Sequence, residues 1–240
     1  MNSPQDDEWL RLALASTYGT RGRLATISRK LPAGQQDIDL GLRYLQPAIA
    51  KNPADPYLQS IAATLGLYRA DLYALSKNIP AATTYYEKSL AALRQAKSPQ
   101  LFRPLYLQTA KASINFSRLL LPTQPAKAKS LYADALESFR VLAEAPSSVM
   151  LDWNEYANAL NESPFPELRQ PAIALRFAER AVEATQRKNP STLDTLAWAQ
   201  YRSGQRAEAL ESIRQALALL PAGPSPFRAI LEKSQAEISQ

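Results

Sequence analysis

The chain has 240 residues but contains neither cysteine nor histidine. Without cysteine it cannot form disulfides, thiolate nucleophiles or zinc–thiolate sites. Without histidine it lacks the most common general base and a frequent metal ligand. Only carboxylates, hydroxyls and lysines are left for catalytic chemistry. We therefore expect no enzyme activity, no bound metal and no cofactor.

Glycine is scarce as well, with seven residues against an average usage of about 7%. The closest pair, Gly19 and Gly22, lacks the spacing of a loop that cradles phosphate groups. Nucleotide hydrolysis and dinucleotide binding are therefore disfavoured. The acidic residues add no catalytic signal, since Asp37 and Asp39 flank an expected helix start, where negative charge suits the helix dipole.

The formal net charge is +6, but the basic residues are dispersed, and Arg21, Arg23, Arg29 and Lys30 form no more than a loose cluster. A nucleic-acid-binding surface usually concentrates positive charge on one element. The N-terminal segment is acidic where a signal peptide would be basic, and no segment approaches the ~18 apolar residues of a membrane span. We expect a soluble cytoplasmic protein that binds neither nucleic acid nor membranes.

Alanine and leucine, both strong helix formers, are abundant and predict an all-α fold. The clearest repeating unit lies at residues 189–221. Ser191 and Asp194 predict a capping box at the start of its first helix. Gly204 predicts a left-handed turn that ends this helix, and a second helix is expected at about 206–220.

This unit resembles the tetratricopeptide repeat (TPR). The resemblance rests on a small residue in the first helix, a turn glycine, a small–large–small pattern in the second helix and a closing proline. These residues are Ala197, Gly204, Ala209, Ile213, Ala216 and Pro221. Small residues on facing sides let two antiparallel helices approach closely.

The small–large–small pattern also begins at residues 41, 82, 128 and 174, ahead of the copy at 209. Successive copies are therefore 41, 46, 46 and 35 residues apart, compared with about 34 in the TPR family. We expect a right-handed superhelical solenoid of four to five irregular hairpins with a C-terminal capping helix, forming one domain over residues 1–240. The expected repeats are 7–53, 54–95, 99–143, 148–189 and 190–221, and the expected cap is 226–239.

Large aromatic side chains are expected to pack inside this array rather than to bind a ligand. Tyr85, Tyr86 and Tyr132 occupy packing positions of second helices. Trp9 and Trp153 are expected to wedge between repeats.

Residues 153–221 are more specifically similar to the C-terminal TPR arrays of large bacterial multidomain proteins, including some Ser/Thr protein kinases. A kinase catalytic loop requires histidine, and the loop over the ATP phosphates is rich in glycine. The chain has neither loop. The resemblance therefore implies an accessory region of such a protein or a free-standing relative.

In stacked helical hairpins the first helices line the concave side, and the resemblance implies that proteins or peptides bind there. The groove positions expected on three of these helices are Lys111, Asn115, Arg118, Asn154, Asn158, Trp198, Tyr201 and Arg202. Asparagines in a groove can hydrogen-bond a peptide backbone, and Lys111, Arg118 or Arg202 can hold a carboxylate.

Two interpretations of these positions stay open. The charged stripe also fits an ordinary solvated helix face, and Trp198 fits either packing on the preceding repeat or a binding hot spot. The sequence thus predicts a non-catalytic interaction scaffold with a protein or peptide partner. The alternative is the accessory or sensory C-terminal region of a bacterial Ser/Thr kinase or similar regulator.

Overall fold

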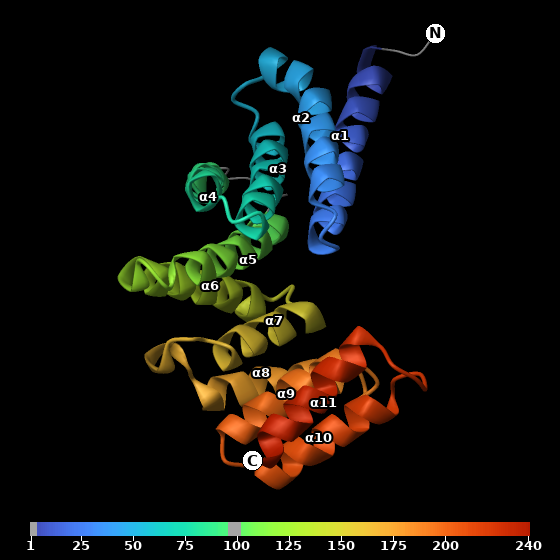
Figure 1. Cartoon of the computed structure of the whole chain (residues 1–240), viewed down its shortest axis with the longest axis vertical. Coiled ribbons are helices and arrows are strands. Elements are labelled where there is room, and N and C mark those ends of the chain that lie inside the picture. Colours follow the sequence, from blue (N-terminus) through green and yellow to red (C-terminus); the bar gives the residue numbers. More distant parts are fainter. Residues whose placement is uncertain (1–3, 96–101) are drawn as a thin grey trace. The chain divides into compact units, whose positions relative to one another are not determined.

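The computed structural model describes residues 4–95 and 102–240, and within these ranges it contains helices and no strands (Figure 1). The α-helices are α1 (Pro4–Ile27), α2 (Leu31–Lys51), α3 (Pro56–Leu75), α4 (Ile79–Gln95), α5 (Phe102–Leu120), α6 (Pro125–Glu144), α7 (Met150–Asn161), α8 (Pro171–Ala184), α9 (Pro190–Arg202), α10 (Arg206–Ala218) and α11 (Pro226–Ser239). A short 3-10 helix, η2 (Pro166–Leu168), lies between α7 and α8. The prediction of an all-α fold is confirmed.

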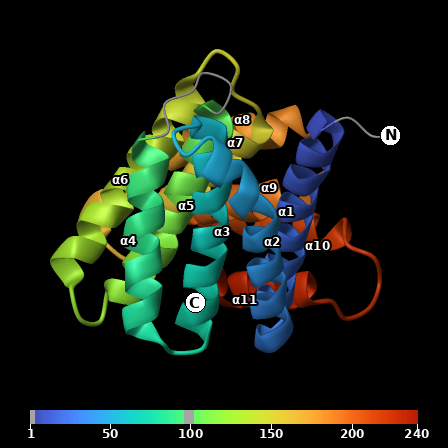
Figure 2. The same ribbon diagram turned by 90° about the horizontal axis from the view of Figure 1, so that it is seen from above.

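Consecutive helices pair into hairpins, which Figures 1 and 2 show for α1–α2 and α3–α4. The same pairing joins α7 with α8 and α9 with α10. The first helices of neighbouring hairpins also contact one another. Helix α1 contacts α3, α3 contacts α5, and α7 contacts α9. The final helix α11 packs on both α10 and α9, so the array ends in the expected capping helix.

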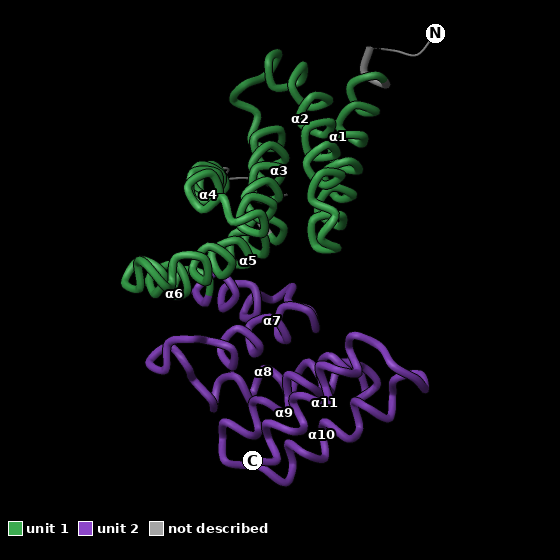
Figure 3. Tube along the Cα trace, viewed as in Figure 1, with its two compact units in different colours: residues 1–135 green, residues 136–240 purple. Residues whose placement is uncertain are grey.

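The chain divides into two compact units, residues 1–135 and residues 136–240, called unit 1 and unit 2 below (Figure 3). The boundary falls within α6. We describe each unit by itself, and a single domain over residues 1–240 stays a prediction.

The residues that the small–large–small pattern singles out belong to the core. In α10, Ala209, Ile213 and Ala216 are all fully buried. Tyr86 and Tyr132 are buried at the corresponding positions of α4 and α6, as expected. The pattern thus correctly identifies the side of each second helix that packs.

Three other aromatic side chains differ in burial. Tyr85 is half-buried and its hydroxyl is 3.2 Å from Arg69 Nη1, so it is not a core residue. Trp153 is half-buried, and its indole donates to the Ala143 carbonyl at 3.1 Å. Trp9 is 71% exposed, so the prediction that it wedges between repeats is wrong.

The helix α9 starts and ends through local backbone chemistry. Its N-cap is Asn189, whose side chain accepts hydrogen bonds from the backbone of Ser191 and Thr192. The predicted capping box of Ser191 and Asp194 is therefore wrong, because the helix already begins at Pro190, where a missing N–H costs nothing. At the other end Gly204 has φ +81° and closes the expected left-handed turn.

The same kind of turn closes α1, α3 and α8, but without glycine. In α3, Lys77 has φ +62° and donates to the Ala74 carbonyl, while Asn78 donates to the Tyr73 carbonyl. In α1 the left-handed residue is Arg29, at φ +61°. This hydrogen-bond pattern is that of a Schellman motif, which favours glycine because other residues are strained at positive φ.

Glycines instead concentrate where helices approach each other. Gly22 on α1 faces Gly34 on α2, and a Cβ atom on Gly22 would lie 2.9 Å from the Gly34 carbonyl oxygen. In the same way, a Cβ atom on Gly41 of α2 would lie 2.9 Å from the Ala15 carbonyl oxygen on α1. The α1–α2 hairpin therefore depends on residues without side chains at its contact.

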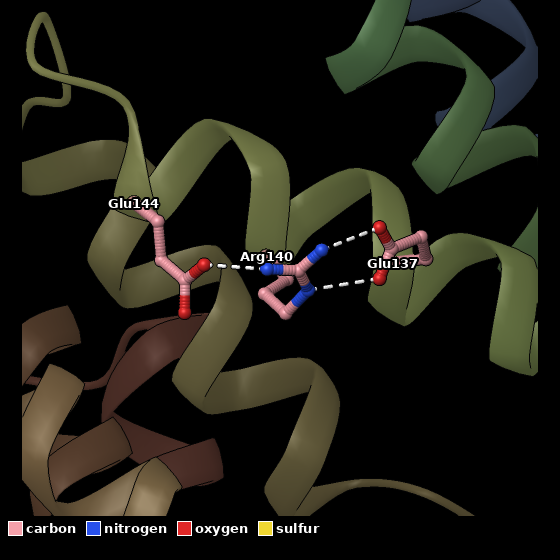
Figure 4. A network of polar contacts seen from close by, with 3 residues as sticks. All are labelled: Glu137, Arg140 and Glu144. Carbon is pink, nitrogen blue, oxygen red and sulfur yellow. Dashed lines mark hydrogen bonds and ion pairs between the residues drawn. The ribbon is translucent and has the colours of Figure 1, made fainter.

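The exposed side of α6 carries a row of charges within unit 2 (Figure 4). Arg140 lies between Glu137 and Glu144, with nitrogen–oxygen distances of 2.7 Å to Glu137 and 2.6 Å to Glu144. The guanidinium lowers the pKa of Glu137 through its hydrogen bonds. Because these side chains are largely exposed, solvent screens the pairs and they add little to stability.

Candidate partner-binding surface

Five of the expected groove residues lie on the first helices of unit 2. Asn154 and Asn158 are on α7, and Trp198, Tyr201 and Arg202 are on α9. We call these five residues the first-helix surface of unit 2. All five side chains are half-buried.

A buried hydrogen bond ties α7 to α9. The side-chain amide of Asn161 donates to the backbone carbonyl of Thr195 at 3.0 Å. Both residues are buried. Because Asn161 is the last residue of α7 and Thr195 lies within the second turn of α9, this bond fixes how far one helix is displaced along the other.

The three α9 residues form one cluster. The rings of Trp198 and Tyr201 meet edge to face, with centroids 5.9 Å apart and an interplanar angle of 79°. The guanidinium carbon of Arg202 lies 5.7 Å from the centre of the Trp198 ring. This arrangement combines an aromatic pair with a cation–π contact.

Two polar atoms of this surface are buried without a hydrogen-bond partner among the described residues, namely Arg202 Nε and Asn154 Oδ1. Burial, and then the nearby positive charge of Arg169, lower the pKa of Arg202 from its ordinary value. A buried donor or acceptor that is left unpaired costs about 1–3 kcal/mol. Both atoms lie beneath the surface that their side chains form.

Trp198 is also a structural residue. Its indole N–H donates to the hydroxyl of Ser234 on α11 at 3.2 Å. Burial raises the pKa of the nearby Asp194 carboxyl on α9 to about 6, although the Ser234 hydroxyl opposes this shift. The sequence predicted packing of Trp198 only on the preceding repeat, and its contact with α11 could not be predicted because the two helices are remote in sequence.

The other three expected groove residues, Lys111, Asn115 and Arg118, are on α5 in unit 1. Lys111 is half-buried, and Asn115 and Arg118 are exposed. The Asn115 amide donates to Asp71 Oδ1 on α3 at 3.1 Å. Asn115 is therefore engaged in packing one first helix on the next.

A second bond with the same sequence separation joins these helices. Thr64 on α3 donates to Gln108 on α5 at 2.6 Å, and both this pair and Asp71–Asn115 are 44 residues apart. The two bonds lie two turns apart along each helix, so α3 and α5 run parallel. Burial raises the pKa of Asp71, although the hydrogen bonds from Tyr86 and Asn115 oppose the shift.

Within the described ranges, His, Cys, Asp and Glu residues form no group of three that could hold a metal ion. No helix in the described part of the chain is long and apolar enough to cross a membrane.

Comparison with known proteins shows likeness at the level of structure. No protein-family model matches the sequence, and no curated protein matches it. The structure is similar to the crystal structure of yeast Tom70, with a TM-score of 0.52 and 14% identity over 100% of this chain. This chain spans 44% of that Tom70 chain, which is less than half of its length.

A second similar structure is the crystal structure of BtubC from P. vanneervenii, with a TM-score of 0.46 and 17% identity over 94% of this chain and 96% of that one. At 14% identity the likeness to TPR-containing Tom70 establishes the fold and nothing finer. The chain is an all-helical array of TPR-like hairpins.

Proposed function

We propose that this protein is a non-catalytic scaffold that binds a segment of a partner protein, and that the first-helix surface of unit 2 contacts this segment. The observation that carries the proposal is the half-buried cluster of Trp198, Tyr201 and Arg202, which places an aromatic pair and a guanidinium side by side on α9. Aromatic residues and arginine are the residue types most often found at binding hot spots.

The chemistry of the surface favours a segment with an acidic residue. Arg202 and Arg169 lie close enough for their charges to interact, and repulsion between them falls when an anion binds. The half-buried side chains of Asn154 and Asn158 carry amide groups, which can hydrogen-bond a peptide backbone. The aromatic pair of Trp198 and Tyr201 offers an apolar contact of the kind found at binding hot spots.

A selection experiment tests this proposal. The full chain is immobilised and used to select binders from a phage-displayed library of random peptides. We expect the selected peptides to share an acidic residue. We expect Arg202→Ala to weaken their binding by about tenfold or more, since a charge-assisted hydrogen bond is lost.

The matched control is Arg214→Ala. Arg214 is an exposed arginine on the second helix α10, paired with Glu211 at 2.7 Å. This variant should bind the selected peptides as the unchanged protein does. The proposal fails if the peptides lack acidic residues, or if Arg202→Ala and Asn154→Ala both bind them as tightly as the unchanged protein.

The alternative predicted from the sequence, an accessory or sensory region of a bacterial Ser/Thr kinase, is a proposal of the same interaction function in another setting. Sequencing the genomic DNA upstream of the Met1 codon tests it. An in-frame catalytic domain would support the kinase setting, whereas a ribosome-binding site would support a free-standing cytoplasmic scaffold.

A further inference from the structure

A second surface lies on the first hairpin of unit 1, away from the residues considered above. A groove of about 590 Å³ runs between α1 and α2. Its apolar lining consists of Leu10 and Leu14 from α1 and Leu40 and Tyr44 from α2. We call it the α1–α2 groove.

The groove is not part of the side of α1 that packs on α3. Ala15 and Gly19 face that direction, since Ala15 belongs to the core cluster around Leu65 and a Cβ on Gly19 would collide with the same leucine. Leu10 lies on a different side of the helix and is 48% exposed. Leu10 therefore lies in a part of the groove that α3 does not cover, whereas Tyr44 also packs against the core cluster and stacks on Tyr18.

Two arginines line the groove, Arg11 from α1 and Arg43 from α2. Both are exposed. Neither makes an ion pair or a hydrogen bond with any residue that the structure describes. By contrast, Arg21 of the same hairpin is paired with Asp37 at 2.5 Å.

The groove also contains one carboxylate, Asp7, so its lining carries two positive charges and one negative charge. Arg11 and Arg43 come from opposite helices and so lie on opposite walls of the groove. An acidic residue on each flank of a bound segment could therefore reach one of them. Charge complementarity of this kind selects the partner and speeds its association.

We infer that the α1–α2 groove binds an amphipathic helix of a partner protein, with apolar residues inserted between Leu10, Leu14 and Tyr44 and with acidic residues on both flanks. Two packed helices present a groove into which the apolar side chains of a third helix fit, at every third or fourth position. This inference uses no residue of the first-helix surface of unit 2, so it does not depend on the proposed function.

Fluorescence anisotropy with the full chain tests the inference. The probe is a labelled synthetic helix with leucines at every third or fourth position and glutamates on both flanks. We expect the unchanged protein to bind this probe, and Arg11→Glu/Arg43→Glu to bind it at least about tenfold more weakly. A second probe with lysines in place of the glutamates should show the opposite preference.

Two controls make the result specific. Lys77→Glu/Lys88→Glu introduces the same charge change at exposed lysines outside the groove and should bind the glutamate probe normally. Arg202→Ala should also bind it normally, which separates this site from the proposed function.

Three outcomes would overturn the inference. The unchanged protein would fail to bind the glutamate probe, or the Arg11→Glu/Arg43→Glu protein would bind it equally well. The third outcome is a sedimentation result in which the unchanged protein is a dimer and the Arg11→Glu/Arg43→Glu protein is a monomer. The groove would then bind a second copy of this chain rather than a partner helix.

Discussion

The indole N–H of Trp198 on α9 donates a hydrogen bond to the Ser234 hydroxyl on the C-terminal helix α11, at 3.2 Å. The two residues are 36 positions apart in the sequence. Ser234 is 5% exposed and lies on the packed side of α11 together with Leu231 and Ile238, which are fully buried. A residue expected to contact a partner thus also holds the capping helix. The proposed binding at this surface and the docking of α11 therefore involve the same side chain.

The first prediction concerns this hydrogen bond. Trp198→Phe keeps an aromatic ring but removes the N–H, leaving Ser234 without its donor. We expect the free energy of unfolding to fall by about 1 kcal/mol, the usual effect of losing one buried hydrogen bond. Chemical denaturation followed by circular dichroism measures the change. The control is Trp9→Phe, which alters an exposed indole and should shift stability by less than about 0.5 kcal/mol; equal effects would contradict the structural role.

The second prediction concerns the buried carboxyl group of Asp194, on the same helix as Trp198. Burial raises the pKa of Asp194 from 3.8 to about 6. Between these two pH values the folded protein binds more protons than the unfolded chain. The free energy of unfolding therefore decreases as the pH rises from about 4 to about 6, by at most roughly 3 kcal/mol, and then stays level in respect of this group.

Asp194→Asn should remove that decrease and make the protein more stable than the unchanged chain at neutral pH. Urea denaturation at a series of pH values provides the comparison. Glu232→Gln is the matched control, since Glu232 is an exposed carboxylate on α11. Should Asp194→Asn show the same pH dependence as the control, the buried carboxyl group would not be its source.

Much of the fold follows from the sequence because its determinants are local. The small–large–small pattern lies within single helices and correctly identifies buried positions such as Ala209 and Ile213. Gly204 is correctly predicted to end α9, since only a few residues decide a helix terminus. The capping box failed for an equally local reason, because Asn189 competes with Ser191 as the first cap.

The candidate surface could be predicted less completely, because its contacts depend on how helices are displaced along one another. The expected residues Trp198, Tyr201 and Arg202 do form one cluster, since helical spacing alone brings them together. The bonds from Asn161 to Thr195 and from Trp198 to Ser234 join different helices. The sequence positions of the two residues in either pair do not indicate that they are bonded.

The third prediction compares two helix ends with the same hydrogen bonds. Lys77 closes α3 at φ +62°, and Gly204 closes α9 at φ +81°. A residue with a Cβ atom is strained by about 1 kcal/mol in this conformation, whereas glycine is not. Lys77→Gly should therefore stabilise the protein and Gly204→Ala should destabilise it, each by about 0.5–1 kcal/mol.

Thermal unfolding of both variants measures these opposite shifts. A steric clash does not contribute to the effect of Gly204→Ala, because a Cβ atom on Gly204 would have no atom within 4 Å. If both variants shifted the unfolding temperature in the same direction, backbone strain would not be the deciding effect.

The last prediction uses two glycines inside helices, where alanine normally gains about 1 kcal/mol. A Cβ on Gly22 would lie 2.9 Å from the Gly34 carbonyl oxygen and 3.0 Å from the Ile38 backbone nitrogen, neither of which can rotate away. A Cβ on Gly66 would instead meet the hydroxyl oxygen of Ser89, which can turn about one bond.

We expect Gly22→Ala to lower the free energy of unfolding by about 1–2 kcal/mol, because separating α1 from α2 costs more than helix propensity returns. Gly66→Ala should leave stability unchanged or raise it. Adding Ser89→Ala to Gly66→Ala removes the remaining conflict and serves as a check. Denaturant titration of the three variants measures their free energies of unfolding. If Gly22→Ala were as stable as the unchanged protein, the α1–α2 hairpin could relax, and its close backbone approach would not be required for packing.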